Sequence, residues 1–175
     1  MEELRLTTAP FEKSVLVTGG CGFLGSFLVN QLDEVAAQLG DAEVNFIDIT
    51  PPRTDFPSLR RSTYHNVSVT DEGALESLIR ATCPDTVFHL AALIDCRPRP
   101  VAQLDKVNVT GTEVLLALCA KYGVARFVYT SSIEVLFHAN RCHGADESTP
   151  YPTERSHGYQ RTKIEAERRV LAADG

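Results

Sequence analysis

Three side chains in this sequence could together move a proton to or from a substrate oxygen. Tyr159 and Lys163 stand four positions apart, so on a helix they share one face. A tyrosine has an unperturbed pKa of about 10, and a neighbouring ammonium favours its phenolate at lower pH. Ser132 supplies a hydroxyl that can donate a hydrogen bond to the same substrate oxygen. The trio predicts that Tyr159 takes an alcohol proton while hydride leaves the carbon for a nicotinamide.

Taken alone, the spacing of Tyr159 and Lys163 is more typical of an ordinary amphipathic helix. Tyr151 illustrates the difference, because the residue four positions later is Arg155. Arginine stays fully charged and cannot shuttle the same protons. The interpretation of Tyr159 and Lys163 as catalytic therefore depends on a cofactor site elsewhere in the chain.

A glycine-rich turn near the start of the sequence supplies that candidate cofactor site. Gly19, Gly22 and Gly25 lie between a short apolar run, 15–17, and an apolar-periodic run, 23–39. Glycine lets the backbone turn sharply and approach a ligand that a Cβ would exclude. The free N–H groups at a helix start, with the helix dipole, favour a pyrophosphate. A glycine turn between a strand and a helix predicts a dinucleotide site, with a purely structural turn as the alternative.

An acidic residue ends the next predicted strand, 44–48. Asp48 follows the last glycine of the turn by about 20 positions, where a carboxylate can accept hydrogen bonds from adenosine ribose hydroxyls. An acid at this position repels a 2′-phosphate, so the sequence predicts NAD in preference to NADP. Arg53 lies close enough in sequence to keep NADP as the alternative.

The rest of the chain alternates predicted strands and helices. Helices are expected at 23–39, 70–80, 101–122 and 157–173, and strands at 15–17, 44–48, 64–69, 86–90 and 126–130. This alternation is typical of an α/β fold with a Rossmann-like, doubly wound parallel sheet. Such sheets bind ligands beyond the carboxyl ends of their strands. The residues expected at those ends are Gly19, Asp48, Ala91, Ala92, Ser131 and Ser132. The apolar residues that the first helix is expected to bury are Phe23, Phe27, Leu28, Leu32, Val35 and Leu39.

Length and composition indicate one globular domain. The 175 residues are 43% hydrophobic and 23% charged, which is ordinary for a soluble protein, and the net charge of −6 argues against a nucleic-acid partner. No apolar run approaches the roughly 18 residues of a membrane span, and the start carries no signal peptide. Five cysteines without a C-x-x-C pair favour reduced thiols and a cytoplasmic location. Cys142 and His143 lack a second close pair, so no metal site is expected. We expect a lead-in over 1–13 and a cofactor-binding domain over 14–175.

Five segments, in this order, resemble the extended short-chain dehydrogenase/reductase family. They are 18–25, 89–92, 108–112, 129–132 and 159–163, and the resemblance spans about residues 14 to 175. Within that family, 130–135 and 167–175 most resemble the 3β-hydroxysteroid dehydrogenase/isomerase branch. Nucleotide-sugar epimerases share the scaffold but usually carry an Ala-Val-Tyr-Gly-like run after the serines, which is absent here.

The resemblance implies an NAD-dependent oxidoreductase that moves hydride between NAD and a secondary alcohol of a steroid or sterol. It implies catalytic roles for Ser132, Tyr159 and Lys163, with Asn108 bracing Lys163 through a water molecule. Lys163 would also contact the nicotinamide ribose. The residues that the resemblance places around the cofactor are Gly19, Gly22, Phe23, Leu24, Gly25, Asp48, Ser68, Val69, Ala91, Ala92, Tyr159 and Lys163.

The sequence departs from the family pattern at Ser68, at Thr162, where serine is frequent, and at its end. Near the end of the third strand the family commonly has an aspartate against the adenine amine, and this chain has Ser68 followed by Val69. A hydroxyl can accept the same bond, more weakly. The family's remaining strands and its substrate domain would lie beyond Gly175, so we expect a truncated fold.

Two other functions stay open from the sequence. One is a nucleotide-sugar epimerase or dehydratase, or a carbonyl reductase, and the other is a non-enzymatic NAD-binding module. For the enzyme, the expected partner is a small-molecule substrate. Homologous folds often dimerise through helices like 101–122 and 157–173, which makes a homodimer the expectation by analogy.

Overall fold

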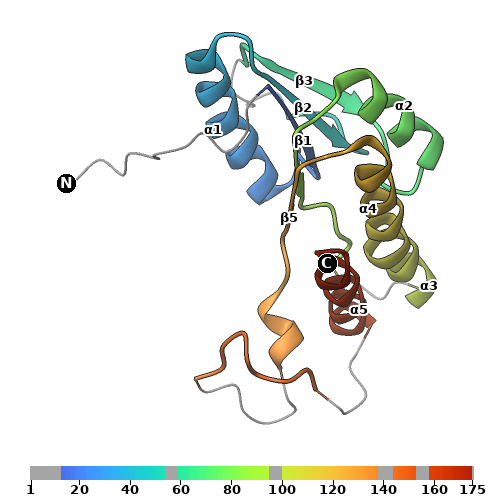
Figure 1. Ribbon diagram of the computed structural model, residues 1–175. Helices are drawn as coiled ribbons and strands as arrows, with labels where there is room; N and C mark the ends of the chain where they lie inside the picture. Colours follow the sequence, from blue (N-terminus) through green and yellow to red (C-terminus); the bar gives the residue numbers. More distant parts are fainter. Residues whose placement is uncertain (1–12, 54–58, 95–99, 138–143, 153–157, 175) are drawn as a thin grey trace.

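A five-stranded parallel sheet organises the molecule (Figure 1). The computed structural model describes residues 13–53, 59–94, 100–137, 144–152 and 158–174. The strands are β1 (Ser14–Thr18), β2 (Glu43–Asp48), β3 (Ser62–Asn66), β4 (Thr86–His89) and β5 (Arg126–Tyr129). Their order in the sheet, β3-β2-β1-β4-β5, runs outward from β1 in both directions, and every pair is parallel. The predicted doubly wound α/β fold is therefore confirmed.

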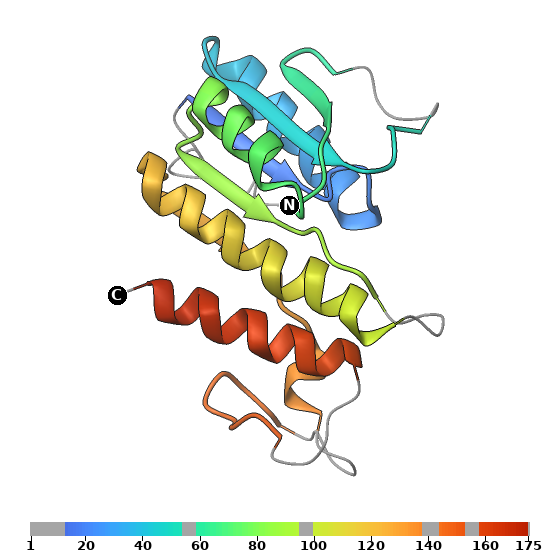
Figure 2. The ribbon, with the colours of Figure 1, turned by 90° about the vertical axis from the view of Figure 1, so that its right-hand side faces the viewer.

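Helices cover both faces of this sheet. They are α1 (Phe23–Leu39), α2 (Glu72–Thr82), α3 (Val101–Leu104), the π-helical η1 (Asp105–Thr110), α4 (Gly111–Tyr122), the 3₁₀-helical η2 (Ile133–Leu136) and α5 (Gly158–Ala173). Side chains alternate along β1, so Val15 and Val17 pack with α1 while Leu16 packs with α2 and α4. α5 runs alongside α4 (Figure 2). None of the helices in the described segments has the length and apolar character to cross a membrane.

The first helix has the predicted bounds but presents a different face to the sheet. Phe23 and Phe27 are 87% and 63% exposed, and Leu39 is also exposed, so the prediction that they are buried is wrong. The buried residues of α1 are Gly25, Val29, Leu32, Asp33 and Ala36. A Cβ on Gly25 would overlap the carbonyl oxygen of Gly19. The close approach of α1 to the turn therefore requires the glycine side, and the phenylalanine side faces outward.

The third strand and the helix over 101–122 also differ from the expectation. β3 ends at Asn66, level with Asp48 of β2, so Ser68 and Val69 lie in the loop after the strand. The helix expected over 101–122 is a single rod whose middle is a π-helical stretch, where the Gly111 N–H bonds the carbonyl of Lys106, five residues back.

The lead-in and one helix start fall outside the described residues. Of the predicted lead-in, 1–13, the structure describes Lys13 alone, and α5 is described from Gly158 rather than the expected His157.

A buried carboxylate fixes the start of β3 against α1. Asp33 accepts hydrogen bonds from the backbone N–H of Arg60 at 3.0 Å and of Arg61 at 2.8 Å, and from the Ser62 hydroxyl at 2.6 Å. Burial opposes ionisation of Asp33, but these hydrogen bonds outweigh it and lower the pKa of the carboxyl group. The contact ties the edge strand to the helix that begins at the glycine turn.

Candidate functional site

A cavity of about 500 Å³ opens at the carboxyl ends of β1, β2 and β4. The predicted cofactor residues that line it are Gly19, Gly22, Asp48, Ser68, Val69, Ala91 and Ala92. They come from four separate segments of the chain, which the sheet order brings together. The sequence did not point to Thr50, Gln103 and Lys106, which also line the cavity. Gln103 and Lys106 arrive from the α3–η1 rod, so the rule about strand ends could not find them.

At the mouth of α1 the cavity is lined by Gly19 and Gly22, which have no side chains. Gly19 has a φ of +71°, and a Cβ there would stand 2.9 Å from the Ala91 nitrogen. The N–H groups of Gly19 and Gly20 both bond the carbonyl of Ile47, at 2.9 and 3.1 Å. Gly22 is the N-cap of α1, and because it is a glycine it has no side chain with which to cap the helix. The first-turn N–H groups of α1 are thus available to an anion such as a pyrophosphate.

Asp48 ends β2 with its carboxylate fixed by two backbone donors. Oδ2 accepts from the N–H of Cys21 at 3.1 Å, and Oδ1 accepts from the N–H of Thr50 at 2.9 Å. Each oxygen keeps a second lone pair that can accept from a ribose hydroxyl. Burial, and then the charge of Asp48, raise the pKa of the Cys21 thiol to about 11, so this thiol stays protonated.

Phe23 and Leu24 at the start of α1, and Ser68 after β3, are three further residues that the sequence predicts at the cofactor. Phe23 and Leu24 are exposed at the first turn of α1, outside the residues that line the cavity. The Ser68 hydroxyl accepts from the Thr70 N–H at 3.2 Å and lies 2.9 Å from the Thr70 hydroxyl. This local turn orients Ser68 at the cavity wall. Contacts of all three with a cofactor stay predictions.

Lys163 is buried at the end of β5. Its side chain is on α5, its exposed fraction is 3%, and Nζ donates to the carbonyl of Thr130 at 2.7 Å. The ammonium lies 4.1 Å from the ring centroid of Tyr129, which provides a cation–π contact. Burial lowers the pKa of Lys163 to about 8, partly opposed by the charge of Glu167. The amine is therefore mostly charged at neutral pH.

The segment that contains Ser132 packs against the first turn of α5. The Ser132 hydroxyl caps η2 by accepting from the N–H of Glu134 at 3.3 Å. Gln160, which follows Tyr159 in α5, donates to the carbonyls of Glu134 and Phe137 at 2.7 and 2.8 Å. Ser132 lines a second cavity, of about 900 Å³, rather than the cavity lined by Asp48. The catalytic roles of Ser132 and Tyr159 stay predictions.

Asn108 sits in η1, 2% exposed, and joins three segments. Its Oδ1 accepts from the N–H of Leu93 at 2.7 Å, while Nδ2 donates to the Leu93 carbonyl and the Thr162 hydroxyl, both at 3.0 Å. The Thr162 hydroxyl donates in turn to the carbonyl of Tyr159 at 2.8 Å. Asn108 thus holds the loop after β4 and the residue that precedes Lys163. The predicted water-mediated brace of Lys163 stays a prediction.

His89 is the buried group that the sequence reasoning did not single out. Its Nδ1 lies 2.7 Å from the Thr18 hydroxyl, and its Nε2 lies 2.9 Å from the Thr112 hydroxyl. Because Thr112 donates its proton to the Asn108 carbonyl at 2.7 Å, Thr112 must accept from His89, which assigns the proton to Nε2. Burial, and then the charge of Lys163, lower the pKa of His89 to about 3. A neutral imidazole therefore links the end of β1 to the η1–α4 rod.

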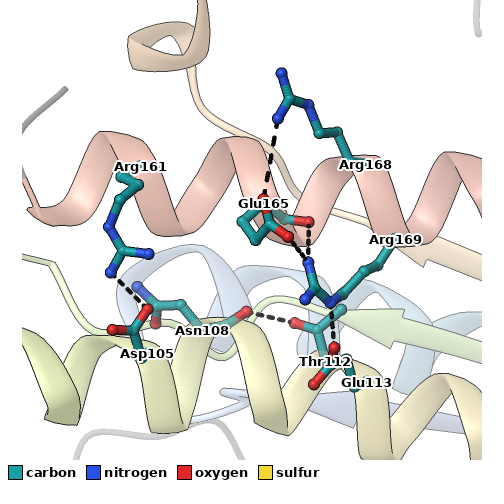
Figure 3. A network of polar contacts seen from close by, with 8 residues as sticks. All are labelled: Asp105, Asn108, Thr112, Glu113, Arg161, Glu165, Arg168 and Arg169. Atoms are coloured by element: carbon teal, nitrogen blue, oxygen red, sulfur yellow. Dashed lines mark hydrogen bonds and ion pairs between the residues drawn. The ribbon is translucent and has the colours of Figure 1, made fainter. Parts of the chain in front are cut away.

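Ion pairs hold α5 along the α3–η1–α4 rod (Figure 3). Arg161 binds Asp105 at 2.6 Å, and Arg169 binds both Glu113 and Glu165. Exposed ion pairs contribute little to stability individually. Their effect here is orientation, because they flank the buried stretch of α5 that carries Lys163. No group of three or more metal-binding side chains occurs in the described part of the chain.

Comparisons with known proteins agree with this geometry. The sequence profile of the 3-beta hydroxysteroid dehydrogenase/isomerase family matches residues 16–175. The short-chain dehydrogenase/reductase family 42E member 1 of Mus musculus is 35% identical over 170 residues, which cover 94% of this chain and 41% of the mouse protein. The 3 beta-hydroxysteroid dehydrogenase/Delta 5-->4-isomerase of Mycobacterium tuberculosis is 36% identical over 171 residues, covering 92% of this chain and 43% of that protein.

A solved structure shares the fold. The UDP-glucose 4-epimerase of Thermus thermophilus in complex with NAD has a TM-score of 0.75 and 26% identity, covering 91% of this chain and 50% of the epimerase. The chain spans less than half of the length of the curated relatives it matches.

Proposed function

Because the chain belongs to the 3-beta hydroxysteroid dehydrogenase/isomerase family, we propose that it is the cofactor-binding and proton-transferring part of an NAD-dependent oxidoreductase. The proposed substrate is a secondary alcohol on a steroid or sterol, the class that names the family. The observation that carries the proposal is the cavity at the strand ends, which has a glycine turn on one side and the Asp48 carboxylate on another.

The residues present fit NAD. Gly19 keeps the turn free of a Cβ that would meet the Ala91 backbone, and the first turn of α1 offers backbone N–H groups to the pyrophosphate. The Asp48 carboxylate suits the two ribose hydroxyls of NAD and would repel a 2′-phosphate, so NADP fits less well. The buried ammonium of Lys163 is suited to the nicotinamide ribose. When bound, NAD supplies the hydride acceptor.

The chain's own residues would handle the proton. Tyr159 takes the proton of the alcohol, and Ser132 donates a hydrogen bond that holds the same oxygen. The Lys163 ammonium favours the phenolate of Tyr159 as long as the amine is charged. Since the pKa of Lys163 is about 8, that support is present below pH 8 and is lost as the pH rises through it.

A second candidate function is that of an epimerase or dehydratase on a nucleotide sugar. The observation that favours it is the likeness to the NAD-bound UDP-glucose 4-epimerase, whose fold covers 91% of this chain. A non-enzymatic NAD-binding module is the third. It would show cofactor affinity without turnover, and Tyr159→Phe would change nothing.

Location is inferred from the cysteines, and assembly from the helices that lie on one side of the sheet. Cysteines without a C-x-x-C pair support a cytoplasmic protein. The α3–η1–α4 rod and α5 lie side by side, and a homodimer through their outer faces is the arrangement that analogy suggests (Figure 2). Sedimentation of the purified chain tests it, and a monomer at all concentrations would contradict it.

Thermal unfolding with and without NAD or NADP tests the cofactor. A ligand at 100 times its dissociation constant stabilises a folded binder by about 2.7 kcal/mol. NAD is expected to raise the transition temperature of the 175-residue chain more than NADP does. A cooperative transition that neither cofactor moves would contradict the proposal.

Turnover tests the chemistry, in the longest natural polypeptide that includes these residues. A 3β-hydroxysteroid and a UDP-sugar are each supplied with NAD. Oxidation of the steroid is followed by the absorbance of the reduced cofactor, and conversion of the UDP-sugar, which returns the cofactor to NAD, is followed by chromatography of the sugar product. Tyr159→Phe is expected to remove nearly all turnover while NAD still stabilises the protein, because only the proton path is lost. Undiminished turnover would sink the assignment of Tyr159, and activity on the UDP-sugar alone would favour the epimerase.

A further inference from the structure

The ammonium of Lys163 is held by groups outside the predicted catalytic set. One donor goes to the Thr130 carbonyl, and the ring of Tyr129 lies beneath the charge at 4.1 Å. A lysine ammonium has three N–H donors, and the described residues accept one of them, so two remain for the hydroxyls of a ribose. The Tyr129 hydroxyl is buried and has no hydrogen-bond partner among the described residues. Its ring, rather than its hydroxyl, is therefore what contributes at this position.

A carboxylate lies one helical turn beyond Lys163 on the same face of α5. Glu167 accepts a hydrogen bond from the Ser131 hydroxyl through Oε2 and from the Tyr151 hydroxyl at 2.7 Å through Oε1. Arg168 lies 4.9 Å from the ring centroid of Tyr151 and covers that ring. Two hydroxyl donors on separate segments thus fix the carboxylate in one place on the face of α5 that carries Lys163.

The charged and titratable groups around Lys163 come from three elements. Tyr159 and Glu167 are on α5, Tyr129 is on β5, and His89 is on β4. His89 is neutral, and burial followed by the charge of Glu167 raises the pKa of Tyr129, so neither supplies a counter-charge. Glu167 is the group whose charge raises the pKa of Lys163 against the effect of burial.

We propose that Tyr129 and Glu167 are positioning residues for Lys163: the ring fixes where the ammonium sits, and the braced carboxylate keeps it charged. The inference rests on the proposed function and deepens it, because it assigns the reaction two residues outside the Ser132, Tyr159 and Lys163 set. Ser131 and Tyr151 act one step further out by holding Glu167. Without the carboxylate, burial would favour the neutral amine, and Tyr159 would lose the charge that favours its phenolate.

Side-chain NMR of the lysines in the 175-residue chain tests the electrostatic part. The lysines are Lys13, Lys106, Lys121 and Lys163, and a Lys163→Arg spectrum assigns the last. A pH titration of the native chain is expected to give Lys163 a pKa of about 8. In Glu167→Gln that pKa should fall below the native value.

Glu165→Gln is the matched control for this variant. It removes the same charge from α5 two positions away, but the Glu165 carboxylate binds Arg169 and lies 4.0 Å from Arg168 (Figure 3). The pKa of Lys163 should stay at its native value in this control. An unchanged pKa in Glu167→Gln, or an equal fall in both variants, would overturn the role of Glu167.

The ring of Tyr129 has its own signature in the same spectra. Protons that lie over an aromatic face resonate upfield. The Cε methylene protons of Lys163 should therefore resonate upfield of the Cε methylene protons of Lys106. Tyr129→Phe should retain this shift, since it keeps the ring and removes the unpartnered hydroxyl. Tyr129→Leu should lose it. A shift that survives in Tyr129→Leu would overturn the role of the ring.

Kinetics then connect the placement to the reaction. In the longest natural polypeptide, Glu167→Gln should move the alkaline limb of the kcat profile to lower pH by the shift seen in the Lys163 titration. KM for NAD should change less than kcat. An alkaline limb that stays in place while the Lys163 pKa falls would contradict the inference.

The NMR result is independent of cofactor, so the two proposals can fail separately. NAD binding by the native chain with a Lys163 pKa that Glu167→Gln leaves unmoved would contradict this inference alone. A pKa that falls as expected in a chain that NAD does not stabilise would support the contact and contradict the proposed function.

Discussion

His89 makes the stability of this chain depend on pH in a way that can be calculated. It is 1% exposed, and its two ring nitrogens lie between the hydroxyls of Thr18 and Thr112. In the unfolded chain its pKa is near 6.5, and in the folded chain it is about 3. A group whose folded pKa is depressed binds its proton mainly in the unfolded state, so the folded state loses stability as the pH falls below 6.5.

The size of the effect follows from the two pKa values. Between pH 7.5 and pH 5.0, protonation of His89 in the unfolded chain alone should cost the folded state about 2 kcal/mol, at 1.36 kcal/mol per pKa unit. Other groups titrate over the same range, so the native chain alone does not isolate this contribution. His89→Gln does, because its amide can still donate to Thr112 and cannot titrate.

Urea unfolding of both proteins at the two pH values measures the difference. At pH 7.5 the variant should be less stable by about 1–3 kcal/mol, since it loses ring packing and the bond to Thr18. At pH 5.0 that gap should shrink by about 2 kcal/mol, which brings the two proteins close together. The ring ¹⁵N shifts of the native protein should report a neutral imidazole with its proton on Nε2 throughout.

A gap that stays constant between pH 7.5 and 5.0 would refute the reasoning. It would mean that His89 titrates in the folded chain much as it does in the unfolded chain, so the buried bridge between Thr18 and Thr112 could not exist as described. If His89→Gln does not fold, the ¹⁵N titration decides alone, and a protonation step above pH 5 in the folded chain has the same meaning.

Three substitutions test other parts of the site and its frame. Gly19→Ala places a Cβ 2.9 Å from the Ala91 nitrogen at a φ of +71°. It should lower the free energy of unfolding in urea by about 1–3 kcal/mol and abolish the stabilisation by NAD. Full stabilisation by NAD would refute the need for glycine at this position. Asp48→Ala should weaken NAD binding about tenfold, as measured by calorimetry, because the charged acceptor of the ribose hydroxyls is lost. It should also narrow the preference for NAD over NADP. An unchanged ratio of the two affinities would count against this role of Asp48. Asp33→Asn should lower the free energy of unfolding by about 1–3 kcal/mol at pH 7. Because the pKa of Asp33 is lowered on folding, this loss of stability should shrink as acid protonates the carboxylate of the native protein. A loss that does not depend on pH would contradict the hydrogen bonds of Asp33 to the start of β3.

The residues at the strand ends were predictable, because alternating strands and helices indicate a parallel sheet, and the carboxyl ends of its strands meet at one edge. Gly19, Asp48 and Ala91 were expected to meet, and the structure places all three around one cavity. The face of α1 was not predictable from periodicity. Residues 23 and 27 lie on one apolar face, and residues 29, 32 and 36 lie on another. The choice between them depends on the contact of Gly25 with the Gly19 carbonyl, which is formed across a turn rather than along the helix.

The buried bridges were also beyond the sequence. Thr18 and His89 stand 71 positions apart, and Asn108 and Thr162 stand 54 apart. Neither pair forms a spacing that helix or strand periods would reveal. Their register is decided by the docking of β4 beside β1 and of α5 beside η1, which depends on the whole sheet.

The contacts between the end of β5 and α5 follow from a match of two repeats. Two residues of extended chain advance about 6.6 Å, and four residues of α-helix advance about 6 Å. Tyr129 and Ser131 can therefore reach Lys163 and Glu167 in parallel, which is the pairing in the structure. The alternation of side chains along extended backbone also separates the two adjacent serines. The Ser131 hydroxyl donates to Glu167 of α5, whereas the Ser132 hydroxyl caps η2 by accepting from the Glu134 N–H. A tyrosine and a serine two apart at a strand end, with a lysine and a glutamate four apart on the next helix, would predict this brace from sequence alone.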